Sequence, residues 1–195
     1  MRKRWVRRLL LGVGCALILC AAALTVIWQI SMKNAAMRSQ EHAALLKQLL
    51  PQDRTAVPEV RADNEMPALS LDGVDYVGLV EIPSQDACLP VRSDWARDLP
   101  APCVFSGSLY DGSLVIGAGS QSGQMPFYAQ LDSGDVLFFT DMTGCCYAYR
   151  INFIEYRDHA DAQAFSEHES EITLFIKNQQ AVREYIILYC TTLGS

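Results

Sequence analysis

The sequence predicts an all-β domain, a closed β-barrel of seven to eight strands with short helices, preceded by an N-terminal transmembrane helix. The last 125 residues contain seven or eight short runs of β-branched and aromatic residues, separated by turn residues and without a long helical pattern. Such spacing is typical of a barrel. A basic segment and a long apolar run precede it. At 195 residues, the chain has room for one domain and an anchor.

The N-terminal region has the pattern of a signal anchor. Residues 1–8 hold five basic side chains, and residues 9–32 contain no acidic, basic or histidine side chain. About 20 apolar residues are enough to cross a bilayer, and basic flanks stay in the cytoplasm. We therefore predict a cytoplasmic segment at 1–8, a transmembrane anchor at 9–32 and an extracytoplasmic remainder in the cell membrane. A cleaved signal peptide is the alternative, but its apolar region is usually only about 7–15 residues long.

Three further regions follow the anchor. Residues 33–51 are rich in helix formers with a partial apolar stripe and end at a proline, which predicts a helical stalk. We expect His42, in this stalk, to be a surface residue. Residues 52–70 contain prolines and many charges without a period, which indicates a linker. Residues 71–195 form the predicted barrel domain.

The strands of the barrel are expected where β-forming residues cluster. The expected strands are residues 75–82, 87–91, 113–118, 136–140, 145–153, 172–176 and 185–189. The proline-marked segment 100–107 is expected to be a loop, and residues 125–131 a short helix. Residues 158–170 are polar and predict a connecting loop that contains His159 and His168 as exposed residues.

Charge and cysteine content narrow the range of ligands. After the anchor, 11 basic residues face 22 acidic residues, so nucleic acid and anionic lipid headgroups are not expected as partners. Five cysteines follow the anchor: Cys88, Cys103, Cys145, Cys146 and Cys190. Their spacing fits no zinc site, and we expect neither a metal nor a cofactor. Outside the membrane a disulfide is permitted, but an odd number of cysteines leaves its pairing open.

Several segments of the domain occur in an informative order. They are YVGLVEIPSQDACLPV, SLVIGAGS, FYAQLDSGDVLFFTD, CYAYRI and ITLFIK…REYIILYC. In this order they resemble the sortases, membrane-anchored cysteine transpeptidases of Gram-positive bacteria, whose patterns include Y-x-G-x-L-x-I-P, V-I-A-x-H-N and L-T-L-x-T-C…R. The resemblance covers residues 71–190. It implies an eight-stranded barrel with an active groove at one end.

The resemblance also implies which residues would carry chemistry. In sortases a cysteine thiolate attacks a Thr–Gly peptide bond, a histidine transfers protons, and an arginine stabilises the oxyanion. In this chain Gly119 stands at the histidine position and Lys177 at the cysteine position. Glycine cannot carry a proton, and a protonated lysine is not a nucleophile. Arg183 is the candidate for the oxyanion arginine, with an ordinary surface arginine as the alternative.

Cys190 is the alternative nucleophile. A second alignment makes residues 185–190 the cysteine strand, but then no residues remain for a last strand or for the arginine. In the first alignment Cys190 lies about 23 Å beyond Arg183 along an extended strand, at the opposite end of the barrel.

These observations predict a membrane-anchored, catalytically degenerate pseudo-sortase that retains a groove for a peptide or an envelope protein. Gly119 and Lys177 argue against enzymatic activity. Two alternatives stay open. One is an active sortase-type transpeptidase that attaches surface proteins to the cell wall through Cys190. The other is a structural membrane module of a cell-envelope complex.

Overall fold

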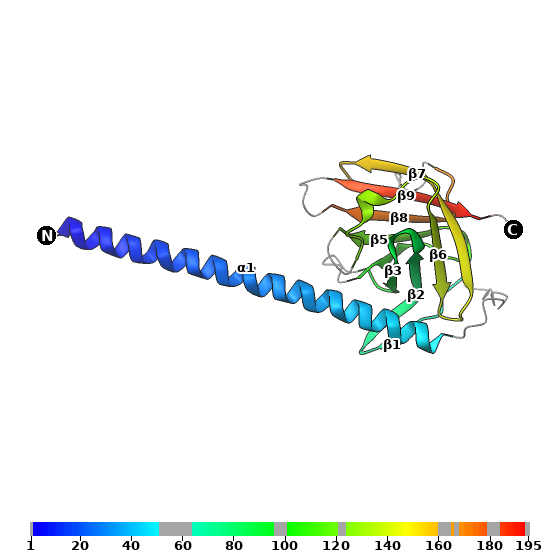
Figure 1. The fold of residues 1–195 in the computed structure, drawn as a ribbon, viewed down its shortest axis with the longest axis horizontal. Coiled ribbons are helices and arrows are strands. Elements are labelled where there is room, and N and C mark those ends of the chain that lie inside the picture. Colours follow the sequence, from blue (N-terminus) through cyan, green and yellow to red (C-terminus); the bar gives the residue numbers. More distant parts are fainter. Residues whose placement is uncertain are drawn as a thin grey trace.

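The computed structural model describes residues 2–50, 64–95, 101–120, 124–159, 165, 168–178 and 184–193. One long helix leads into a β-barrel (Figure 1). The helix α1 spans Arg2–Leu49. The strands are β1 Leu69–Leu71, β2 Val74–Ile82, β3 Ala87–Arg92, β4 Cys103–Ser106, β5 Leu114–Gly119, β6 Val136–Asp141, β7 Cys146–Arg157, β8 Ile172–Lys177 and β9 Tyr185–Thr192. Two short 3₁₀ helices are η1 Pro83–Gln85 and η2 Tyr128–Gln130.

Eight of the strands close into a barrel. Their order is β2-β3-β4-β5-β8-β9-β7-β6, and β6 pairs back onto β2. The short strand β1 adds to β2 outside this ring. Two pairings, β3–β4 and β5–β8, are parallel, and the others are antiparallel. The predicted all-β closed barrel is therefore confirmed.

The barrel core comes from alternate residues of each strand, because neighbouring strand residues point to opposite faces. On β8, Ile172, Leu174 and Ile176 pack into the main core, whereas Phe175 packs into a second apolar cluster on the outer face. Strands β5 and β9 alternate in the same way, so that these three strands are buried on both faces. This double burial explains why they appear as continuous apolar runs in the sequence.

Two strands lie where none was expected. Strand β4 occupies the segment that was predicted to be a loop at 100–107, because Pro102 precedes the strand and the residues that follow it can pair with β5. Strand β1 lies at the end of the predicted linker 52–70 and forms a hairpin with β2. Strand β7 also continues beyond residue 153 to Arg157, because β9 pairs with it as far as the Arg157–Tyr185 pair. The short helix expected at 125–131 is η2.

The C-terminal part of α1 packs on the barrel (Figure 1). Ala43, Leu46 and Leu50 form a small apolar core with Tyr76 and Leu79 of β2. The predicted stalk is therefore helical to Leu49 and belongs to the packing of the domain.

No helix among the residues that the structure describes is long and apolar enough to cross a membrane. The anchor at 9–32, which lies within α1, stays a prediction from the sequence. Most of the predicted linker, residues 52–63, lies outside the described residues.

The docking of α1 can be tested with two adjacent leucines. Leu46 is 0% exposed and Leu45 is 47% exposed. We expect Leu46→Ala to lower the free energy of unfolding by about 2–4 kcal/mol, because it leaves a cavity between α1 and β2. Leu45→Ala is the matched control and should change it by less than about 0.5 kcal/mol. Urea unfolding of the full chain in detergent measures both, and equal effects would contradict the packing of α1 on the barrel.

Candidate functional site

The ends of β5 and β8 form one corner of the barrel, which we call the β5–β8 corner. It comprises Gly119, Ser120, Lys177 and Asn178. The two strands are parallel, and their register places Gly119 directly opposite Lys177. The backbone N–H of Ser120 donates to the carbonyl of Lys177 at 3.1 Å. The structure thus brings together the two residues that the sequence alignment sets at the histidine and cysteine positions.

Alternation along the strands sets which way these residues face. Ile176 and Ala118 lie in the main core, so Lys177 and Gly119 belong to the outer face. Lys177 is exposed, whereas Gly119 is buried. At the corner, the Lys177 side chain is therefore exposed to solvent next to the buried backbone of Gly119.

The loop after β5 returns to Gly119. The side-chain oxygen of Gln124 accepts a hydrogen bond from the Gly119 N–H, and the Met125 N–H donates to the Gly119 carbonyl at 3.1 Å. Gln124 is only 1% exposed. Both backbone groups of Gly119 are therefore satisfied within the fold. The sequence did not single out Gln124, because an isolated glutamine in a polar loop has no periodic signal.

Asn178, which follows β8, pairs with Glu184, which precedes β9. The Asn178 N–H donates to the Glu184 carbonyl at 2.9 Å, and its side-chain amide donates to the Glu184 carboxylate at 2.6 Å. Arg183, the candidate oxyanion arginine, lies outside the described residues.

Cys190 does not lie at this corner. It pairs with Ile172, at the opposite end of β8 from Lys177. Five strand residues correspond to about 17 Å. Its side chain is part of the main core, and burial raises the pKa of its thiol to about 12. A buried neutral thiol of this kind is inert as a nucleophile.

The other groups with nucleophilic or acid–base side chains are also dispersed. Cys103 on β4 pairs with Gly117, two strands away from β8 or about 10 Å across the sheet. Its buried thiol donates to the Ala101 carbonyl at 3.6 Å. His159 and His168 are exposed, as expected. The ring of His168 contacts that of Phe153 in a tilted arrangement, with a centroid distance of 4.4 Å.

An aromatic surface lies on the same outer face of the barrel as the β5–β8 corner. It consists of Trp95, Phe105, Phe165 and Phe175, with neighbouring ring centroids 4.9–5.6 Å apart. Gly117 lies beneath it, since a Cβ there would be 2.3 Å from the Trp95 ring. Trp95 and Phe105 remain 42% and 39% exposed. Phe175 is two residues from Lys177, so the rings lie beside the corner.

Comparison with solved structures identifies this architecture. Sortase C of Streptococcus pneumoniae superimposes with a TM-score of 0.55 at 16% identity, over 84% of this chain and 89% of that one. Sortase D5 of Clostridium perfringens, a transpeptidase, gives 0.55 at 15% identity over 77% and 99%. Sortase C of C. perfringens gives 0.53 at 14% identity over 84% and 88%. The chain has a sortase-like fold. No protein-family model and no curated protein matches its sequence.

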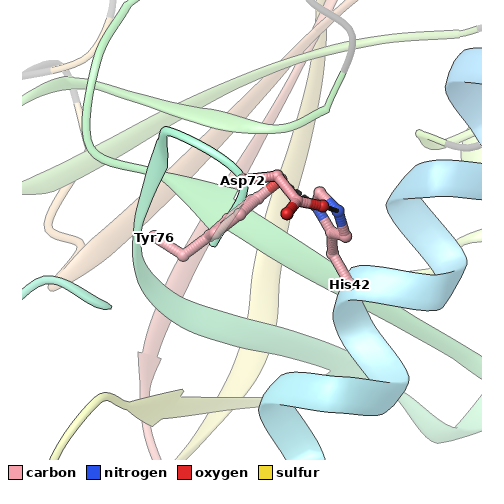
Figure 2. Close-up of polar contacts among 3 residues, drawn as sticks. All are labelled: His42, Asp72 and Tyr76. Carbon is pink, nitrogen blue, oxygen red and sulfur yellow. Dashed lines mark hydrogen bonds and ion pairs between the residues drawn. The ribbon is translucent and has the colours of Figure 1, made fainter. Parts of the chain in front are cut away.

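Apart from the β5–β8 corner, this sortase-like barrel carries a polar cluster where α1 meets the β1–β2 hairpin (Figure 2). His42 Nδ1 lies 2.8 Å from the Tyr76 hydroxyl, and His42 Nε2 lies 3.2 Å from an Asp72 carboxylate oxygen. The side chain of His42 is only 12% exposed. Our expectation that His42 is a surface residue is therefore wrong.

The reason lies in the face that α1 presents to the barrel. The buried positions Ser39, Ala43, Leu46 and Leu50 recur at spacings of three and four, and His42 borders this stripe. Asp72 occupies the hairpin turn with a φ of +51°, which brings its carboxylate next to the helix. The helical spacing was a signal in the sequence, but β1 of the hairpin that meets the helix was not predicted, because this short strand straddles the end of the predicted linker 52–70.

The chemical inertness of Cys190 can be measured. With a pKa of about 12, its thiolate fraction at pH 7 is about three-thousandfold lower than that of a free cysteine with a pKa of about 8.5. We expect iodoacetamide to leave Cys190 unlabelled in the folded chain and to label it in guanidinium. Because its pKa is raised, labelling should increase only above about pH 11. Peptide mass spectrometry reports the site, and rapid labelling at pH 7 would show that the thiol is accessible.

Proposed function

We propose that this chain is a membrane-anchored, extracytoplasmic sortase-like protein that holds a peptide or a segment of an envelope protein without cleaving it. The observation that carries the proposal is the pairing of Gly119 with Lys177 at the ends of β5 and β8. These are the positions where the sequence resemblance expects the catalytic histidine and cysteine. Their adjacency supports the alignment on which the loss of both groups rests.

The chemistry of transpeptidation supports a binding role. A thioester forms only if a thiolate attacks the peptide carbonyl and an acid protonates the leaving amine. Among the described residues, the β5–β8 corner offers the amine of Lys177, the hydroxyl of Ser120, the amide of Asn178 and the backbone of Gly119, and it contains no thiol and no imidazole. If the lysine amine attacked a peptide, it would form an amide, which is as stable as the bond that is broken. The reaction would stop there, without turnover.

The aromatic surface supports retention of a ligand. Trp95 and Phe105 are partly exposed on the outer face beside the corner, in contact with the buried Phe175. Large aromatic side chains bury much area at little entropic cost and are common anchors in peptide recognition. The exposed Lys177 adds a donor for a carbonyl or carboxylate at the end of this surface.

The structural neighbours suggest the class of ligand. Sortase C of Clostridium perfringens is described with the C-terminal cell wall sorting motif. We extend a ligand of this peptide type to the present chain. The predicted anchor at 9–32 would hold the barrel on the extracytoplasmic side of the cell membrane of a Gram-positive cell, where such peptides occur.

The competing proposal, catalysis through Cys190, has less support. Its thiol lies in the core with a pKa of about 12, at the other end of β8 from Lys177. A substrate would reach it only if β8 and β9 separated.

A fluorescent peptide with a sorting-type Thr–Gly bond tests the binding role. We expect saturable fluorescence anisotropy with the full chain in detergent, and no cleavage product by mass spectrometry. Trp95→Ala should weaken binding about tenfold, because it removes an aromatic anchor. Tyr156→Ala is the matched control, since Tyr156 is 59% exposed on β7 and outside the aromatic surface. It should bind like the native chain.

The opposite result is equally clear. Cleavage of the peptide that disappears in Cys190→Ala or Cys103→Ala would establish a cysteine transpeptidase or protease and overturn the binding-only proposal. Absence of any saturable binding would leave neither function supported.

A further inference from the structure

A pocket of about 500 Å³ lies between α1, the β1–β2 turn and the strands β2 and β3. It shares no lining residue with the β5–β8 corner or the aromatic surface. Its charged and polar lining includes Arg38, Glu41 and His42 of α1, Asp72 of the hairpin turn, Tyr76 of β2 and Arg92 of β3. The pocket is large enough for a small-molecule group, since ligand sites are typically about 300–1,000 Å³.

Arg92 has a buried hydrogen-bond donor, its Nε, that lacks an acceptor among the described residues. A buried donor without a partner costs about 1–3 kcal/mol, and such groups in native proteins usually have a role. The guanidinium lies close enough to Tyr76 that its charge lowers the pKa of the phenol, although burial, the larger effect, raises that pKa overall. The missing acceptor would therefore sit beside the Tyr76 hydroxyl.

Two arginines and two acidic residues line the pocket. Arg38 lies one turn before His42, and the i, i+4 spacing places both on one face of α1. Of the two acids that line the pocket, Asp72 is engaged by His42 Nε2 at 3.2 Å. Among the described residues, neither Arg38 nor Arg92 makes a salt bridge. Both guanidinium groups therefore line the pocket beside the carboxylates of Glu41 and Asp72, and among the described residues they form a salt bridge with neither.

We propose that this pocket binds a phosphate group, held by Arg92 and Arg38 with the Tyr76 hydroxyl beside it. A guanidinium binds phosphate through two parallel N–H donors, which is why arginine is common in phosphate sites. The His42 contacts to Tyr76 and Asp72 fix the phenol in place (Figure 2). The pocket volume exceeds that of one phosphate, which leaves space for the group that the phosphate is attached to.

Two sources could supply the phosphate, a soluble phosphate ester or a lipid headgroup. Arg38 lies six residues beyond the predicted anchor, about 9 Å along the helix, which is close to the outer limit of a headgroup region about 5–8 Å deep on each side. The acidic character of the chain after the anchor disfavours general attraction to anionic lipids. Binding of a lipid phosphate would therefore depend on this pocket and not on overall charge.

Calorimetric titration of the full chain in a nonionic detergent tests the proposal. The probes are inorganic phosphate, short-chain phosphatidylglycerol and short-chain phosphatidylcholine. We expect Arg92→Gln to weaken phosphate binding at least about tenfold, because it removes a charge-assisted pair of donors. Arg38→Gln should weaken phosphate binding as well. Because Arg38 is exposed, this variant should keep the native fold, so that it still tests the site if Arg92→Gln misfolds. Arg150→Gln on β7 is the matched control, since Arg150 is exposed and lies outside the pocket.

Each outcome decides between the sources or against the site. Arginine-dependent binding of inorganic phosphate alone indicates a soluble ligand. Arginine-dependent binding of phosphatidylglycerol that exceeds that of inorganic phosphate and of phosphatidylcholine indicates a lipid headgroup. The proposal is overturned if none of the probes binds, or if Arg150→Gln weakens binding as much as Arg38→Gln and Arg92→Gln do.

Discussion

The parallel register of β5 on β8 is the constraint on which the candidate site depends. Six consecutive pairs join the strands, from Leu114–Ile172 to Gly119–Lys177. A shift by one residue would turn Lys177 into the core and expose Ile176, at a cost of several kcal/mol from the buried ammonium alone. The burial of alternate apolar residues therefore fixes this register. It also fixes what stands at the corner, because the last pair of the ladder is the pair that bears on chemistry.

The same double burial explains how much of the fold could be predicted from the sequence. Runs such as residues 113–118 and 172–176 are apolar because both of their faces are covered, and their existence needed no tertiary information. Strand β4 was missed because prolines around a short segment usually indicate a loop. The closing pair β2–β6 joins residues about 60 positions apart, and no local pattern encodes such a pairing. It followed only from the resemblance to a barrel family.

Some residues of the candidate site could likewise be predicted from the sequence, and others could not. Gly119 and Lys177 could be selected from the sequence because each ends a segment with a recognisable pattern. The aromatic surface could not, because Trp95, Phe105 and Phe165 come from loops or a short strand with no shared period. They meet only over Gly117, where the absence of a side chain leaves room for the indole. His42 was likewise misjudged, since a histidine beside an apolar stripe is buried or exposed according to what packs on the helix.

The docking of α1 on the barrel depends mainly on apolar packing. The small core of Leu46, Leu50 and Tyr76 joins a continuous helix to β2, one of the strands that close the barrel. The nearby Lys47–Glu81 pair is too exposed to hold this joint by itself. Apolar packing and the His42 contacts therefore set the angle of the helix. If the chain binds a ligand without turnover, as we propose, this rigid docking favours binding, because a rigid support loses less entropy on binding than a free tether does.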